Sequence, residues 1–239
     1  GIAQAPFSYT NTLAIGAEEE VTLGSYTFAG GVTYNFVFHS ENPGGQADQN
    51  PANDTLMVNG FMTALNGTYT IGPALTDDFS TLQAAVDALV SRGICGPVVF
   101  NVATGSGPYD GGVQIPAING SSALNTITFN GNGAVVNATA QPYILGFFGT
   151  SYVTVNNFQF INPVPANSRF GIHVSGGSQY LSFTNNVIDV GTTSTSSTSG
   201  GIIVSGSPTS ATTAGNNGSY LTITGNHFIG GYYGITMLG

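Results

Sequence analysis

Charged side chains are the scarcest feature of this sequence. They make up 5% of its 239 residues, against roughly 25% in an ordinary globular domain. Lysine is absent, the only arginines are Arg92 and Arg169, and eleven acidic residues give a formal net charge of −9. So few cations cannot neutralise the phosphates of a nucleic acid or hold the chain on an anionic membrane surface. We therefore expect neither of these partners.

Cysteine and long apolar runs are also missing. Cys95 is the single cysteine, which excludes a disulfide framework or a cysteine metal cluster within the chain. We expect its thiol to be buried as a small apolar group. No apolar run reaches the roughly 18 residues of a membrane-spanning helix, so we predict no membrane insertion. The polar surface must come from Asn, Thr, Ser and Gly, a composition typical of secreted β-proteins.

Residues 1–64 carry a β-pattern of their own. Apolar residues alternate with polar ones between 21 and 38, and Gly30–Gly31 interrupts the alternation. This pattern predicts a hairpin with one buried face. A turn-rich loop and one more short strand, TLMVNGF at 55–61, follow. These strands are too few for the roughly seven of a complete sandwich. We predict a partial antiparallel β-sandwich segment that is incomplete or borrows strands from outside the sequence.

One stretch predicts an amphipathic helix at about residues 78–92. Its apolar residues recur on one helical face: Phe79, Leu82, Val86 and Leu89. Ser80 and Gln83 have the spacing of a capping box, and Gly93 is placed to end the helix. The residues after it, GPVVFNVATGSGPYDGGVQIP, indicate a strand, a turn and a second strand.

The second half of the chain repeats one short phrase. YVTVNNFQFINP begins at 152, YLSFTNNVIDV at 180 and YLTITGNHFIGG at 220, and NTITFNGNGAVV at 125 is a degenerate earlier copy. Strand-like repeats with periods of 20–50 residues indicate a β-solenoid. Asn132, Asn157, Asn186 and Asn226 align at the turn after each strand, so we predict that their amides form a ladder between stacked turns. An antiparallel sandwich would also alternate, but it does not require the same residue type at the same corner.

The start of this region resembles a known fold family. An amphipathic helix followed by Gly96, Val98, Phe100, Gly105 or Gly107, and Tyr109 resembles the entry into right-handed parallel β-helices of the pectin-lyase-like type. The resemblance implies that the helix closes one end of the solenoid. The predicted fold class is therefore all-β, with a helix-capped right-handed parallel β-helix at 65–239 after the partial sandwich at 1–64. We expect the β-helix to continue beyond the last residue, and the chain to be a piece of a longer protein.

Catalytic groups are sparse in this predicted solenoid. From residue 120 onward, Asp189 is the only acidic residue and Arg169 the only basic one. A glycosidase needs two carboxylates, and a lyase arginine would need acidic neighbours to hold calcium. His39, His173 and His227 are scattered, and although the last two could approach on neighbouring turns, two histidines without a third ligand make a weak metal site. We predict no catalytic residues and no enzyme activity.

A cluster of oxygen-bearing side chains precedes the last strand of the first segment. Asp48, Asn50, Asn53 and Asp54 lie within seven residues, and hard oxygen ligands of this kind can bind calcium. We assign Asp48, Asn50 and Asp54 as the calcium candidates, with simple Asx turns as the alternative. The Asp54-Thr55-Leu56 stretch resembles the acceptor for O-glycans in Bacteroidota, which makes Thr55 a candidate glycosylation site.

Threonine pairs also occur on the predicted strands. Thr126 with Thr128, and Thr222 with Thr224, resemble the T-x-T pairs of ice-binding solenoids. The phrases YVTV and YLSF interrupt such an array. The β-propensity of threonine is therefore the better explanation of these pairs.

Taken together, these features resemble the giant repetitive surface proteins and adhesins of Bacteroidota, in which immunoglobulin-like modules adjoin β-helix modules. The spacing of Asp48, Asn50, Asn53 and Asp54 before a final strand carries the immunoglobulin-like part. The resemblance implies type IX secretion to the exterior of the outer membrane. It also implies adhesion to an extracellular surface or polysaccharide, with a role in gliding and contacts to other domains of a larger surface assembly. Two alternatives stay open: a carbohydrate-active β-helix enzyme with its site in missing coils or in the loop at 191–217, and a filament or scaffold subunit.

Overall fold

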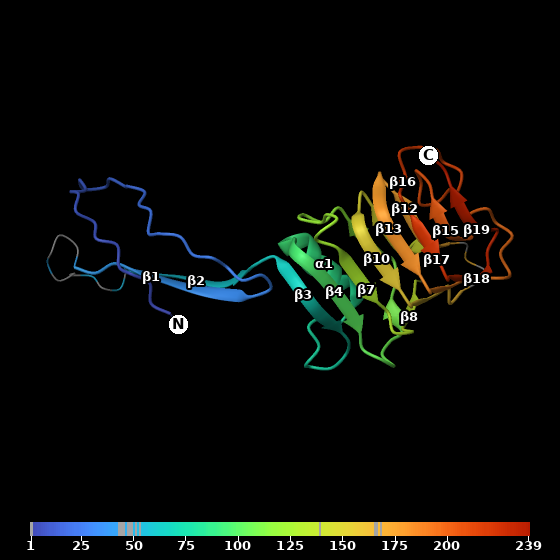
Figure 1. The fold of residues 1–239 in the computed structure, drawn as a ribbon, viewed down its shortest axis with the longest axis horizontal. Helices are drawn as coiled ribbons and strands as arrows, with labels where there is room; N and C mark the ends of the chain where they lie inside the picture. The colour runs from blue at the N-terminus through green and yellow to red at the C-terminus, as the bar shows by residue number, and fades with distance from the viewer. Residues whose placement is uncertain are drawn as a thin grey trace. The chain divides into compact units, whose positions relative to one another are not determined.

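The computed structural model describes residues 2–42, 46, 50, 52, 54–138, 140–164, 167 and 169–239. The chain divides into two compact units, Gly1–Thr63 and Ala64–Gly239. The first unit contains a two-stranded antiparallel sheet of β1 (Thr33–His39) and β2 (Thr55–Met62). The second unit is a parallel β-solenoid with one helix (Figure 1).

The hairpin predicted around Gly30–Gly31 is wrong. A turn is present there, but residues 21–28 form no strand, and β1 pairs with β2 instead. The ring of Phe28 packs on the β1–β2 sheet, with centroids 5.1 Å from Tyr34 and 5.4 Å from Phe61. The alternating apolar residues before the turn therefore reflect ring packing on a sheet face and not strand pairing.

The repeated phrases are consecutive turns of the solenoid. Val153 in one copy pairs in parallel with Leu181 in the next and with Ile127 in the previous turn. The described part of the chain makes about six turns, and each full turn adds one strand to each of three sheets. The unequal sequence gaps between copies hold the polar loops at 192–199 and 205–217, which lie outside the strand ladders.

The three sheets, named here sheets I, II and III, consist of parallel strands from successive turns. Sheet I contains β3 (Leu65–Ile71), β4 (Ile94–Val102), β7 (Ile127–Asn130), β10 (Ser151–Asn156), β13 (Ser178–Thr184), β16 (Gly218–Ser219) and β17 (Thr222–Thr224). Sheet II contains β5 (Tyr109–Asp110), β8 (Val135–Asn137), β11 (Gln159–Ile161), β14 (Val187–Gly191) and β18 (His227–Gly230). Sheet III contains β6 (Val113–Pro116), β9 (Tyr143–Phe148), β12 (Phe170–Ser175), β15 (Gly200–Val204) and β19 (Tyr233–Met237).

Inward-facing side chains fill the space between the sheets. In β10 and β13, Val153, Val155, Leu181 and Phe183 are fully buried, while the residues between them are more exposed. Burying a side chain of this size contributes roughly 1.5–3 kcal/mol. Because a single turn cannot cover these side chains, the stacking of turns is what makes the strands stable.

Helix α1 (Leu82–Arg92) covers the end of the solenoid formed by its first turn. It buries Leu82, Ala85, Val86 and Leu89, and it contacts β3 and β6, the first strands of sheets I and III. Figure 1 shows it beside β3 and β4. The helix therefore protects an apolar core and two strand edges, as the sequence predicted.

The predicted N-terminal cap of this helix is one residue out. Thr81, and not Ser80, is the cap, because its Oγ1 accepts a hydrogen bond from the Ala84 N–H at 3.1 Å. Phe79 lies before the helix and packs its ring 5.7 Å from that of Phe100. Gly93 ends the helix with φ 66°, and a Cβ at this position would lie 2.8 Å from the Asn119 carbonyl oxygen.

Candidate functional site

The outward face of sheet I carries two in-register columns of side chains that are polar except for Val99. Strand alternation places every second residue on this face, because the residues between them point into the core. The first column is Thr68, Val99, Thr128, Thr154, Ser182 and Thr222. The second column is Thr70, Asn101, Asn130, Asn156, Thr184 and Thr224. None of these side chains is ionisable.

The second column is bonded to itself. Asn130 donates its amide to Asn101 Oδ1 at 2.9 Å, and Asn156 donates to Asn130 Oδ1 at 3.4 Å. The hydroxyl of Thr184 then donates to Asn156 Oδ1 at 3.0 Å. These bonds hold the side chains in one orientation along the sheet, so this column is ordered before any ligand arrives.

A stack of three tyrosines borders the first column. Tyr152, Tyr180 and Tyr220 lie two residues before the threonine or serine of their turn, and their rings stack with centroids 4.7 and 4.6 Å apart at 5° and 4° between planes. All three have left-handed backbones, with φ 60°, 54° and 52°. A bulky residue in this region costs roughly 1–2 kcal/mol, and each ring pair returns about 0.5–1.5 kcal/mol. Stacking of the two ring pairs therefore offsets part of the cost of the three left-handed backbones.

Seven hydroxyl groups of the first column and the tyrosine stack differ from those of the second column in their hydrogen bonding. None of the hydroxyls of Tyr152, Tyr180, Tyr220, Thr128, Thr154, Ser182 and Thr222 forms a hydrogen bond with another residue that the structure describes. We call these seven residues the hydroxyl strip. Tyr180 and Tyr220 are 41% and 69% exposed, and the remaining members are half-buried or exposed. The strip is therefore an uncharged row of donors and acceptors that is open to a ligand.

The predicted asparagine ladder divides into separate positions. Asn186 and Asn226 do stack: the Asn186 amide donates to Asn226 Oδ1 at 3.0 Å, and each residue also donates to a backbone carbonyl of the preceding turn. Asn156 pairs with Thr184 in the next turn. The residue that follows it, Asn157, therefore corresponds to the exposed Asn185 and not to Asn186.

The shared feature of the exposed corner is its backbone conformation. Asn132, Asn157 and Asn185 have left-handed backbones with φ 50°, 56° and 55°, and Gly225 takes the same conformation in the next turn. Asn132 donates to the Val102 carbonyl at 2.7 Å and does not bond to the other three predicted ladder residues. The sequence alignment allowed one gap and so matched Asn157 with Asn186, whereas the strand register places Asn157 one position before the buried corner. The Asn101–Asn130–Asn156 column was missed, although each of its members is the last or second-last residue of its strand, directly after a buried Phe or Val.

His173 lies on the outer side of sheet III, where it is covered. It is 4% exposed, its ring is 5.9 Å from that of Tyr143, and its Nε2 lies 3.1 Å from the Ser205 carbonyl oxygen. Burial lowers the pKa of the His173 imidazole, which keeps the ring neutral. His227 lies in β18 of sheet II, so the structure does not bring these two histidines together. Arg169 is also buried, which lowers its pKa, and it donates to the Gln141 carbonyl.

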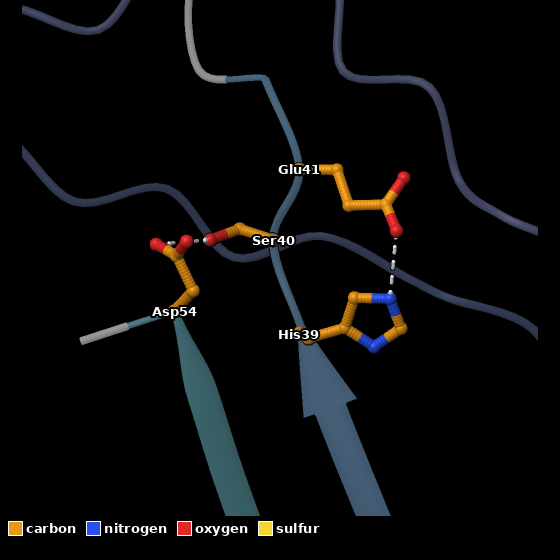
Figure 2. Close-up of polar contacts among 4 residues, drawn as sticks. All are labelled: His39, Ser40, Glu41 and Asp54. Atoms are coloured by element: carbon orange, nitrogen blue, oxygen red, sulfur yellow. Dashed lines mark hydrogen bonds and ion pairs between the residues drawn. The ribbon is translucent and has the colours of Figure 1, made fainter. Parts of the chain in front are cut away.

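The calcium candidates are only partly placed. Asp48 lies outside the described residues, Asn50 is exposed, and Asp54 Oδ1 accepts a hydrogen bond from Ser40 Oγ at 3.3 Å. Figure 2 shows the nearby Glu41 carboxylate turned to His39, 3.1 Å from its Nε2, and away from Asp54. No group of three or more His, Cys, Asp or Glu side chains suited to a metal occurs in the described part of the chain.

Thr55 and Cys95 are both exposed. Thr55 begins β2, so its hydroxyl remains a candidate for modification. The expectation of a buried Cys95 thiol is wrong. In β4 the inward positions are Ile94, Gly96 and Val98, and alternation leaves Cys95 on the outside.

The two carboxylates on the strands of sheet II, those of Asp110 and Asp189, are widely spaced. Asp110 borders a hollow near α1 that is also lined by Pro73, Ser80, Thr81, Gly107, Pro108 and Tyr109. Asp189 occupies the same column of sheet II three strands further on. Three strand spacings amount to about 14 Å, beyond the roughly 5–9.5 Å between the paired carboxyl groups of glycosidases. These two residues cannot act on one glycosidic bond.

No protein-family model matches this chain, and no curated protein or solved structure matches it either. In the described residues, none of the helical structure is long and apolar enough to cross a bilayer. The fold places the chain among parallel β-solenoid proteins, and its function has to be argued from its surfaces.

Proposed function

We propose that this chain is a non-catalytic adhesion module that binds glycans on extracellular surfaces. In this proposal it is secreted, displayed outside the outer membrane as part of a larger surface protein, and used in attachment or gliding. The observation that carries the proposal is the hydroxyl strip, an exposed, uncharged and in-register row of groups without protein partners.

The chemistry of the strip suits sugars. Sugar hydroxyls are neutral and need both donors and acceptors, which threonine, serine and tyrosine hydroxyls supply. The individual bonds are weak, but a row that repeats from turn to turn can bind several sugars of one chain at once, and linked contacts add to overall avidity. Attachment to a polymer or a coated surface needs this kind of binding, and it needs no reacting group.

The arrangement of charges favours binding over catalysis. The strip contains no carboxylate, imidazole or cationic side chain, and Asp110 and Asp189 are about 14 Å apart by strand spacing. His173 and Arg169 are buried, and the side chain of each lies within hydrogen-bond distance of a backbone carbonyl. The low charge and the richness in Asn, Thr, Ser and Gly support an extracellular role.

Retention on polysaccharides tests this proposal. The purified chain is mixed with insoluble cellulose, chitin and de-esterified pectin, and both its depletion from the supernatant and the release of reducing ends are measured. We expect depletion on at least one polymer with no new reducing ends. Release of reducing or unsaturated products would instead establish a carbohydrate-active enzyme, and absence of retention on every polymer would refute glycan adhesion.

A further inference from the structure

We infer that the ligand is a linear, uncharged polysaccharide that lies along the solenoid axis, in the step between the tyrosine stack and the threonine column. This inference rests on the proposed function and assigns it a place and a ligand class. It is argued from the repeat distance, the shape of the step, the charge distribution and the order of the side chains.

The repeat distance of the face matches a repeating ligand. Neighbouring strands lie about 4.8 Å apart, and the stacked tyrosine rings follow at 4.7 and 4.6 Å. Thr128, Thr154, Ser182 and Thr222 pair directly across four strands. An extended β-1,4-linked chain advances by a comparable length for each sugar, so successive sugars can meet equivalent hydroxyls on successive turns.

The step has one raised side and one flat side. Two of the stacked tyrosines, Tyr180 and Tyr220, are 41% and 69% exposed, whereas Thr154 is half-buried in the flat face. A sugar chain on the flat side contacts threonine methyl groups with its C–H faces and threonine hydroxyls with its own hydroxyls. The phenol groups of the stack can donate to ring and glycosidic oxygens from the side.

The net negative charge of the chain disfavours binding of acidic polysaccharides. The chain has a net charge of −9 and two arginines. Arg92 lies at the end of α1, and Arg169 is buried at sheet III, so neither belongs to the columns of this face. A uronate or sulfate on the ligand would lose water without gaining a cation, which is unfavourable. A neutral polymer has no such cost.

The side chains are ordered in advance. Stacking fixes the three tyrosine rings. Hydrogen bonds between the side-chain amides of Asn101, Asn130 and Asn156 fix the neighbouring column. Such order reduces the conformational entropy lost on binding, so that weak bonds to hydroxyls can yield useful affinity.

Single substitutions in the strip can remove one group at a time. Thr154→Val keeps the shape and removes the hydroxyl, and the column already accepts valine at Val99. Tyr180→Asn removes a ring while allowing the left-handed backbone. Thr193→Val, in the exposed loop after β14, is the matched control outside the strip. Circular dichroism establishes that each variant is folded.

Binding is measured by titration calorimetry with a length series of cello-oligosaccharides, and compared with malto-oligosaccharides and oligogalacturonides. We expect affinity for cello-oligosaccharides to rise with each added sugar up to the length of the strip. Thr154→Val should weaken binding about 3–10-fold, as expected for one hydrogen bond. Tyr180→Asn should weaken it at least as much, and Thr193→Val should leave it unchanged.

The possible failures are distinguishable. If folded Thr154→Val and Tyr180→Asn bind like the parent, or if affinity ignores chain length, the placement in the step is wrong even though retention on polysaccharide would still support adhesion. Equal or tighter binding of oligogalacturonides would overturn the neutral ligand, and equal binding of the curved malto-oligosaccharides would overturn the linear one. If no oligosaccharide binds and no polymer retains the chain, both the inference and the proposed function fail.

Discussion

The buried amide of Asn186 provides a test of how the solenoid turns are held together. Asn186 is 1% exposed, and its Oδ1 accepts the Phe158 N–H at 2.9 Å. Its Nδ2 donates to the Val155 carbonyl and to Asn226 Oδ1, both at 3.0 Å. One side chain therefore links three consecutive turns at a corner that water does not reach.

Asn186→Ala removes all of these bonds. It leaves the Phe158 N–H without this acceptor, at a cost of about 1–3 kcal/mol, and loses the net contribution of the amide donor, about 1 kcal/mol. We expect the free energy of unfolding to fall by about 2–4 kcal/mol. Urea unfolding followed by far-ultraviolet circular dichroism and by tyrosine fluorescence measures this difference, provided that the two signals change together.

Asn185→Gly is the matched control, because it removes an amide from the neighbouring residue. Asn185 is exposed, its amide donates one solvent-exposed hydrogen bond to Asn156 Oδ1 at 3.1 Å, and its φ of 55° is one that glycine adopts freely. We expect this variant to change the free energy of unfolding by less than about 0.5 kcal/mol. If the two variants unfold at the same urea concentration, buried amide bonding does not hold this corner, and the reasoning is refuted.

Three further predictions follow from individual residues. Burial lowers the pKa of His173 below its ordinary value of 6.5, so the unfolded chain protonates first. The stability contributed by His173 is therefore complete above about pH 6.5 and is lost as the pH falls, by at most about 1.4 kcal/mol per pH unit. His173→Gln should make the urea midpoint less sensitive to acid, and an unchanged sensitivity would contradict this reasoning. Cys95 is exposed, so a thiol reagent should label the folded chain as fast as the urea-unfolded one, and protection in the folded state would contradict its outward position. The calcium hypothesis predicts saturable calorimetric binding with a dissociation constant of about 10⁻⁴–10⁻³ M, as in extracellular modules. Asp54→Asn should abolish this binding, and absence of heat with the parent chain would reject the site.

The local pattern of apolar and polar residues was sufficient to predict the strands that repeat from turn to turn. The alternation around Val153, Leu181 and Ile223 faces one core, and the recurrence of this alternation predicts stacked turns. Helix α1 was also predictable, because its apolar face and Gly93 are encoded within a few residues. Its cap was misplaced by one residue because Ser80 and Thr81 are both good capping residues.

The sequence predictions were wrong where a residue's position depends on strand pairing with residues far away in the sequence. Residues 21–28 alternate like a strand, yet the strand that pairs with β1 lies beyond residue 54. Asn157 and Asn186 look equivalent in the repeated phrase, but strand register places Asn157 beside Asn185. A shift of one residue moves a side chain to the opposite face of a strand, and only pairing with the next turn decides between the two.

The sequence by itself determined the class of fold, because periodic burial is a local property that every turn repeats. It also determined that the chain is poor in charge and net acidic, since the composition leaves two arginines and eleven acidic residues to place. Only the tertiary structure decided that seven hydroxyls from four turns lie side by side, that three tyrosines stack outward, and that Cys95 is exposed while His173 is covered. Those features depend on the register between residues about 26 to 40 positions apart, which is set by cooperative packing of the whole solenoid and by no single segment.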